Sequence, residues 1–228
     1  MRLLKIIALT ALLPGACAAQ TLTPAQALDR YLATSRSPHD RCAGLTFTIQ
    51  IDASLPKLKK HGSMSGVKLL SQTGKIAYHG LQFTGDKLVK TDVIARFLAQ
   101  DSGLEKQGSD ASVSRQNYTF VYLKTSDYNG LPALVFHLKP RHKRTGLFEG
   151  ELWLEAATAT PLRLWGDFVK SPSIFVRNFR FVEDYQDLNQ CFQPSRLLLT
   201  ADTRIAGLME MSVWEQFVKN QPASDLDQ

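Results

Sequence analysis

The segment Leu147–Tyr185, LFEGELWLEAATATPLRLWGDFVKSPSIFVRNFRFVEDY, decides the fold, because apolar and polar residues alternate through it. Turns at Thr158–Pro161 and Ser171–Ser173 divide it into three strand-like pieces. The apolar positions are Leu152, Leu154, Leu162, Leu164, Phe168, Phe175, Phe179 and Phe181, with Arg177 interrupting the last set. The positions between them are Glu149, Glu151, Trp153, Glu155, Arg163, Trp165 and Asp167. A period of two through successive pieces predicts an antiparallel sheet with one apolar and one wetter face.

The run Gly150–Tyr185 is also similar to bacterial outer-membrane lipoprotein-sorting proteins, which have the LolA/LolB-like fold. Three further pieces carry the same resemblance: PKLKKHGSM around Lys57–Met64, VKTDVIARFL at Val89–Leu98, and TADTRIAGLMEMSVWEQF at Thr200–Phe217. Together they cover most of the chain that follows the N-terminal leader. None of these motifs is catalytic, so the resemblance concerns the fold more than an activity.

The resemblance implies a mainly β protein with a few helices (α+β). Its strongly curved antiparallel sheet would form an incomplete barrel, with the apolar concave face covered by helices. The best-known members carry the acyl chains of lipoproteins across the periplasm. The same fold also occurs in proteins that sense envelope stress by binding partner proteins.

Residues Met1–Ala19 have the pattern of a secretory signal. Arg2 and Lys5 precede a short apolar core, and Ala16-Cys17-Ala18 offers a small-x-small cleavage site. Acylation of Cys17 is an alternative, although Pro14 is unusual in a lipoprotein signal. We therefore expect a periplasmic protein with a signal peptide at 1–19, one domain at 20–219, and a disordered tail at 220–228.

The net charge limits the classes of partner that the protein can bind, and the cysteine content indicates a possible disulfide. Removing Arg2 and Lys5 lowers the formal net charge from +6 to +4, which favours anionic membrane surfaces and is too small to indicate nucleic acid. Two cysteines then remain, Cys42 and Cys191. An oxidising compartment favours a disulfide between them, whereas two separate thiols are the alternative. We expect a monomer.

Elements outside the central segment follow the same rules. Thr23-Pro24-Ala25-Gln26 predicts a capped helix start, and Thr91-Asp92 predicts the start of a second helix with an apolar edge. Further strands are expected at 45–51, 75–83, 118–122, 131–138, 193–203 and 205–217. The sequence Asp127-Tyr128-Asn129-Gly130 predicts a tight hairpin turn.

Catalytic and cofactor motifs are missing from the sequence, and we predict no enzyme, no cofactor and no metal site. In Gly62-Ser63-Met64-Ser65-Gly66, methionine stands where a nucleophile elbow needs serine. Ser65 and Lys68 have the spacing of a serine–lysine pair, but no partner motif accompanies them. His137 and His142 have a poor spacing for a metal.

Two functional hypotheses remain. In the first, the concave face holds a lipid or lipoprotein acyl chain; the expected lining residues are Phe47, Ile49, Ile94, Phe97, Phe120, Phe179, Phe181 and Met211. In the second, the protein is an envelope regulator or scaffold that acts through protein contacts. A basic patch would then matter more; its residues are Lys139, Arg141, His142, Lys143 and Arg144. The same patch could steer a carrier to anionic lipid or to a partner protein in the inner or outer membrane.

Overall fold

The computed structural model describes residues 21–35, 42, 44–71, 75–102, 111–171, 176–189 and 191–220. The expected signal peptide, Cys17, Phe175 and the tail after residue 220 lie outside them. In chain order the elements are α1 Pro24–Thr34, β1 Leu45–Leu55, η1 Pro56–Leu58, β2 Lys60–Leu70, β3 Ile76–Gly85, η2 Val89–Ile94, α3 Ala95–Asp101, β4 Tyr118–Tyr128, β5 Leu131–Pro140, β6 Phe148–Glu155, β7 Pro161–Phe168, β8 Val176–Leu188, β9 Cys191–Thr203 and β10 Gly207–Asn220.

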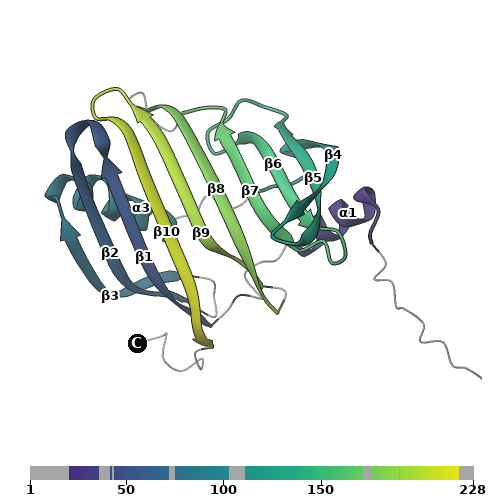
Figure 1. Ribbon diagram of the computed structural model, residues 1–228, viewed down its shortest axis with the longest axis horizontal. Coiled ribbons are helices and arrows are strands. Elements are labelled where there is room, and N and C mark those ends of the chain that lie inside the picture. The colour runs from purple at the N-terminus through teal and green to yellow at the C-terminus, as the bar shows by residue number, and fades with distance from the viewer. Residues whose placement is uncertain are drawn as a thin grey trace, which may run out of the picture.

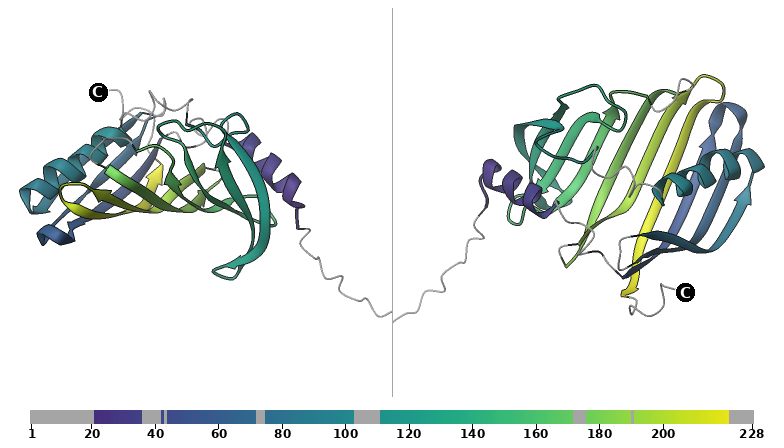
Figure 2. Two further views of the ribbon diagram at one scale, coloured as in Figure 1. Left: turned by 90° about the horizontal axis from the view of Figure 1, so that it is seen from above. Right: turned by 180° about the vertical axis from the view of Figure 1, so that it is seen from behind.

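All ten strands belong to one antiparallel sheet with the order β3-β2-β1-β10-β9-β8-β7-β6-β5-β4 (Figure 1). The edge strands β3 and β4 are not paired with each other, so the sheet stays open. Figure 2 shows that the sheet is strongly curved and that α3 lies over the inner face of β1 and β2. The predicted class, a curved and incomplete antiparallel barrel with helices on its concave side, is confirmed.

The alternation that predicted the sheet is confirmed in β6 and β7. In β6 every second residue from Phe148 to Leu154 is buried, and the residues between them are exposed or half-buried. The buried set faces the concave side and joins one large apolar cluster with residues of α1, η2 and α3. The concave side therefore carries the hydrophobic core.

On the outer, convex face, side chains of neighbouring strands form hydrogen bonds with one another. The indole N–H groups of Trp153 and Trp165 both donate to Oε2 of Glu151, at 3.0 and 3.1 Å. Arg180 donates two hydrogen bonds of 2.8 Å to Asp167 on the next strand. Such cross-strand pairs each stabilise a sheet modestly, by roughly 0.2–1 kcal/mol.

The first helix begins as predicted. The Thr23 hydroxyl oxygen accepts the backbone N–H of Gln26, and the side chain of Gln26 accepts the backbone N–H of Thr23. These two hydrogen bonds form a capping box at the start of α1. The predicted start of the second helix at Thr91-Asp92 is wrong. The helical turn already begins after Asp86, whose carboxylate accepts the N–H of Leu88 at 2.9 Å, and Thr91 lies inside the helix.

The predicted hairpin at Asp127–Gly130 is confirmed between β4 and β5. Asn129 and Gly130 both have positive φ, at 52° and 85°. Two consecutive residues in that region are what a type I′ turn requires, because its twist matches that of the strands it joins.

Gly150 on β6 is directly opposite Gly166 on β7. A Cβ added at Gly150 would lie 1.8 Å from the carbonyl oxygen of Trp165, so the backbone itself would have to move. We expect Gly150→Ala to lower the free energy of unfolding by about 3 kcal/mol, measured by urea denaturation. Gly80→Asn is the control, since that position faces open space and asparagine tolerates its positive φ. An equal loss in both variants would contradict the account.

Candidate ligand-binding face

The strand register places apolar side chains of the concave face in rows that cross β8, β9 and β10. We call Phe179, Ala201 and Met209 the first row, Phe181, Leu199 and Met211 the second row, and Glu183, Leu197 and Val213 the third row. Phe179 and Met209 in the first row are half-buried, whereas all three residues of the second row are buried. The concave face is thus apolar in its first two rows and gains a carboxylate in the third.

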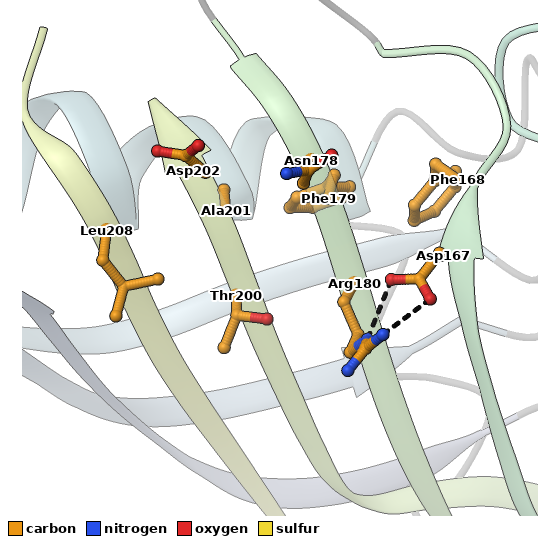
Figure 3. A pocket seen from close by; sticks show the side chains of 9 residues that line it. All are labelled: Asp167, Phe168, Asn178, Phe179, Arg180, Thr200, Ala201, Asp202 and Leu208. Carbon is orange, nitrogen blue, oxygen red and sulfur yellow. Dashed lines mark hydrogen bonds and ion pairs between the residues drawn. The ribbon is translucent and has the colours of Figure 1, made fainter. Parts of the chain in front are cut away.

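A hollow of about 480 Å³ opens at the end of the sheet beside the first row (Figure 3). Phe168, Phe179 and Ala201 contribute to it from the concave face. The other six lining residues are out of phase with the first row and belong to the convex face, namely Asp167, Asn178, Arg180, Thr200, Asp202 and Leu208. Most of the hollow is therefore on the convex face, and it reaches the concave face at the rim of the sheet. The rings of Phe168 and Phe179 are stacked there, with centroids 5.0 Å apart.

Beyond the third row, the concave face becomes polar. The ammonium group of Lys68 on β2 is buried and lies 2.8 Å from Oε1 of Glu215 on β10 and 3.1 Å from Oδ2 of Asp101 at the end of α3. The hydroxyl of Tyr78 on β3 also donates to Asp101. These contacts fix the last residue of α3 to the inner face of the sheet.

The charges in this cluster do not balance. Burial by itself would lower the pKa of Lys68, but Glu215 and Asp101 outweigh it and the pKa is raised. Burial also raises the pKa of Glu215, more than Lys68 lowers it. The single ammonium group of Lys68 is shared between two carboxylates. This sharing favours the charged form of Lys68, and it leaves Glu215 with less than one full positive charge to offset its burial.

Glu183 and Tyr185 extend the polar region on β8. The Tyr185 hydroxyl donates to Oε2 of Glu183 at 2.5 Å. Burial raises the pKa of Glu183, and the charges of Asp101 and Glu215 raise it further. Burial likewise raises the pKa of Tyr31 on α1 to about 12, so this phenol stays neutral. We call Lys68, Tyr78, Asp101, Glu183, Tyr185 and Glu215 the polar cluster.

Most of the residues expected to line the cavity lie on or against the concave core. Ile49, Ile94, Phe181 and Met211 are buried members of its large cluster, and Phe97, Phe120 and Phe179 are half-buried beside it. Phe47 is the exception. It is buried in a separate small cluster with Leu45, Leu70, Cys42 and Cys191.

The disulfide between Cys42 and Cys191 forms the centre of that small cluster. It connects the chain before β1 to the first residue of β9, with 5.1 Å between the two Cα atoms. Phe47 therefore packs around a covalent cross-link rather than in the rows that lead to the rim.

The five basic patch residues lie at the end of β5 and in the connection to β6, and all are exposed. Two of them have structural contacts. Arg144 donates to Oδ1 of Asn117 at 3.0 Å, and Arg141 donates to the carbonyl of Arg115 at 3.0 Å. Within the described residues no carboxylate lies within ion-pair distance of Lys139 or Lys143. The positive charges of these two exposed lysines are therefore available to a binding partner.

The polar cluster was not predicted from the sequence, although a signal was present. Glu183 is in phase with Phe179 and Phe181, and Glu215 is in phase with Met211 and Val213. A charged residue in phase with an apolar stripe must be buried on the apolar face once the strand forms. The sequence alone cannot show that these separate strands bring their charges together.

Two absences apply to the described part of the chain. None of its helices is long and apolar enough to cross a membrane. Nor does it contain a group of three or more His, Cys, Asp or Glu side chains placed to hold a metal ion.

No protein-family model matches the sequence, and a search of curated proteins gave no match either. Solved structures do match over most of the chain. One is a putative outer-membrane lipoprotein-sorting protein domain from Vibrio parahaemolyticus, with 12% identity, 88% of this chain and 97% of that chain covered, and a TM-score of 0.42. Another is a LolA superfamily protein from Nitrosomonas europaea, with 10% identity, coverages of 88% and 97%, and a TM-score of 0.37.

A third match is a DUF1329 family protein from Desulfovibrio piger, with 10% identity, 83% of this chain and 91% of that chain covered, and a TM-score of 0.43. The group of lipoprotein-sorting proteins that the sequence resembles is therefore also present among the structural matches.

Proposed function

We propose that this protein is a non-enzymatic binding protein of the cell envelope. It shelters the apolar part of a lipid, or of a lipoprotein acyl chain, against the concave face of its sheet. The observation that carries the proposal is the half-buried first row of the concave face, in which Phe179 and Met209 are only partly covered by the described residues. The signal-like residues 1–19 fit export to the periplasm.

Binding of an apolar chain on this face needs no specific chemistry. Burying one methylene group contributes about 0.8 kcal/mol, so a few methylene groups covered by the first row stabilise a complex measurably. Methionine and phenylalanine suit this role, because Met209 can adjust its shape to a flexible chain and Phe179 offers a large flat surface.

Entry of a longer chain requires movement of a segment that packs on the concave face. The segment η2–α3 packs on the inner face of β1 and β2, and its residues Val89, Ile94 and Leu98 belong to the same core cluster. In this proposal η2–α3 is a lid. Its far end is held to the sheet by the contacts of Asp101.

Binding of a fluorescent fatty acid to the purified protein tests the proposal. We expect the double variant Phe179→Ala/Met209→Ala to bind the probe about tenfold more weakly, because about 1.4 kcal/mol of apolar contact is lost. Trp214→Ala is the matched control, since Trp214 is exposed on the convex face, where it lies under Arg196. Absence of binding to the unmodified protein would remove the proposal.

A second function is favoured by the exposed lysines of the basic patch. If the protein instead acts through a protein partner, Lys139 and Lys143 would supply the contact. We expect Lys139→Glu/Lys143→Glu to abolish capture of an envelope partner in a pull-down while leaving the fatty-acid affinity unchanged. Lys170→Glu, an exposed lysine outside the patch, controls for charge alone. Unchanged capture by the double variant would exclude this role for the patch.

A further inference from the structure

The polar cluster makes the two ends of the concave face chemically different, because one end is apolar and the other carries charged groups. Its described ionisable groups are the carboxyl groups of Asp101, Glu183 and Glu215 and a single ammonium group, that of Lys68. Tyr78 and Tyr185 add phenols that already donate to Asp101 and Glu183. The cluster thus has more acceptor capacity than its own donors use, and it carries negative charge in excess when its carboxyl groups are ionised.

One carboxylate oxygen of the cluster accepts no hydrogen bond from the described residues. Oε1 of Glu215 accepts from Lys68, but Oε2 of Glu215 is buried and has no hydrogen-bond partner among the described residues. The whole residue is only 8% exposed. A buried carboxylate oxygen without a donor costs free energy, which a ligand that supplies the donor recovers.

Access to the cluster is possible at Glu183. This residue is half-buried as a whole among the described residues, and it is directly opposite Leu197 in the third row. Glu183 follows Phe179 by four residues on the same strand face, a separation of roughly 13 Å at the usual rise of a strand. That length fits a hydrocarbon tail of about ten carbon atoms between the rim and the carboxyl group.

We propose that the bound amphiphile carries an amine in its polar head, which donates hydrogen bonds to Glu183 and to the free oxygen of Glu215 while its tail lies along the first two rows. This inference rests on the proposed function, because it assigns the head group of the ligand that the concave face shelters. A carboxylate or phosphate head would instead meet like charges from Asp101, Glu183 and Glu215.

The affinity should also depend on pH. Burial raises the pKa of Glu183 and so favours its protonated form. The titratable groups that face it are Tyr185, Tyr31, Asp101, Glu215 and Lys68. An ammonium ligand binds best when Glu183 is ionised. Its affinity should therefore rise as pH rises through the raised pKa of Glu183, while a long-chain amine remains protonated.

Three ligands with the same tail test the inference: dodecylamine, dodecanol and dodecanoate, each measured below its micellar concentration by displacement of a fluorescent probe from the full purified protein at pH 8. We expect the amine to bind at least tenfold more tightly than dodecanoate, with the alcohol between them. In Glu183→Gln this preference should fall to threefold or less. Glu210→Gln makes the same charge change at an exposed convex position and should keep the preference.

Folding of the key variant is checked in the same samples. Because the raised pKa of Glu183 means that folding favours the protonated form, the stability linked to this group is lost as pH rises through its folded pKa. Glu183→Gln should therefore unfold at pH 8 at the same urea concentration as the unmodified protein, or at a higher one.

The outcomes separate the two proposals. Equal binding of all three ligands, or tighter binding of dodecanoate, would overturn the amine head group and leave the apolar binding face intact. An amine preference that survives in Glu183→Gln would overturn the assignment to this cluster. Failure of all three ligands to bind would overturn both proposals.

Discussion

Replacing Cys42 and Cys191 together by alanine is expected to lower the free energy of unfolding by about 5 kcal/mol. The two cysteines are 149 residues apart in the sequence, so their bond removes much of the conformational freedom of the unfolded chain. Both side chains are buried, and alanine leaves a small space rather than a new polar group. The measurement is urea denaturation under non-reducing conditions.

Two comparisons make this result specific. The single variant Cys42→Ala should lose nearly as much as the double variant, since either change removes the whole cross-link. The unmodified protein treated with a reductant should fall to a similar stability. A loss of less than 1 kcal/mol in the double variant would contradict a stabilising role for this cross-link.

Replacing Lys68 by methionine is the second large expected effect, with a loss of about 3–5 kcal/mol in the free energy of unfolding at pH 8. Methionine keeps an unbranched side chain, one heavy atom shorter than that of lysine, and removes the ammonium group. Asp101 and Glu215 then face each other without a cation in a region that is almost closed to water. Chemical denaturation at several pH values measures the loss.

The triple variant Lys68→Met/Asp101→Asn/Glu215→Gln is the matched control. It removes all three charges together, and its stability should return to within about 2 kcal/mol of the unmodified protein, because a neutral cluster carries no unpaired charge. For the same reason the loss in Lys68→Met should shrink as pH falls through the pKa of Glu215, which burial raises, because that carboxyl group is then neutral. A triple variant as unstable as Lys68→Met would show that its packing, rather than its charge, matters.

Local patterns predicted the elements of this fold well. The alternation in Leu147–Phe168 predicted β6 and β7, and Asn129-Gly130 predicted the turn between β4 and β5, because each depends on residues that are neighbours in the chain. The start of the second helix was wrong for a comparable reason. Asp86 supplies the first side-chain contact of that helix, five residues before the threonine that the cap pattern indicated.

The site was less predictable, because it depends on which strands become neighbours. β10 pairs with β1 and β9, and this register brings Glu215 to Lys68 over a sequence distance of 147 residues. Phe47 has the same alternation as Ile49, yet it packs around the disulfide because β1 extends beyond the large core cluster. Neither outcome is encoded in a local pattern.

The central claim is that the concave face holds an apolar guest. Mass spectrometry of the organic extract of the protein, purified from the envelope without detergent, tests this most directly. The account predicts one class of lipid or acylated molecule at close to one equivalent per chain, reduced in Phe179→Ala/Met209→Ala and unchanged in Trp214→Ala. An extract that contains no such molecule, from a protein that also fails to take up added lipid, would contradict it.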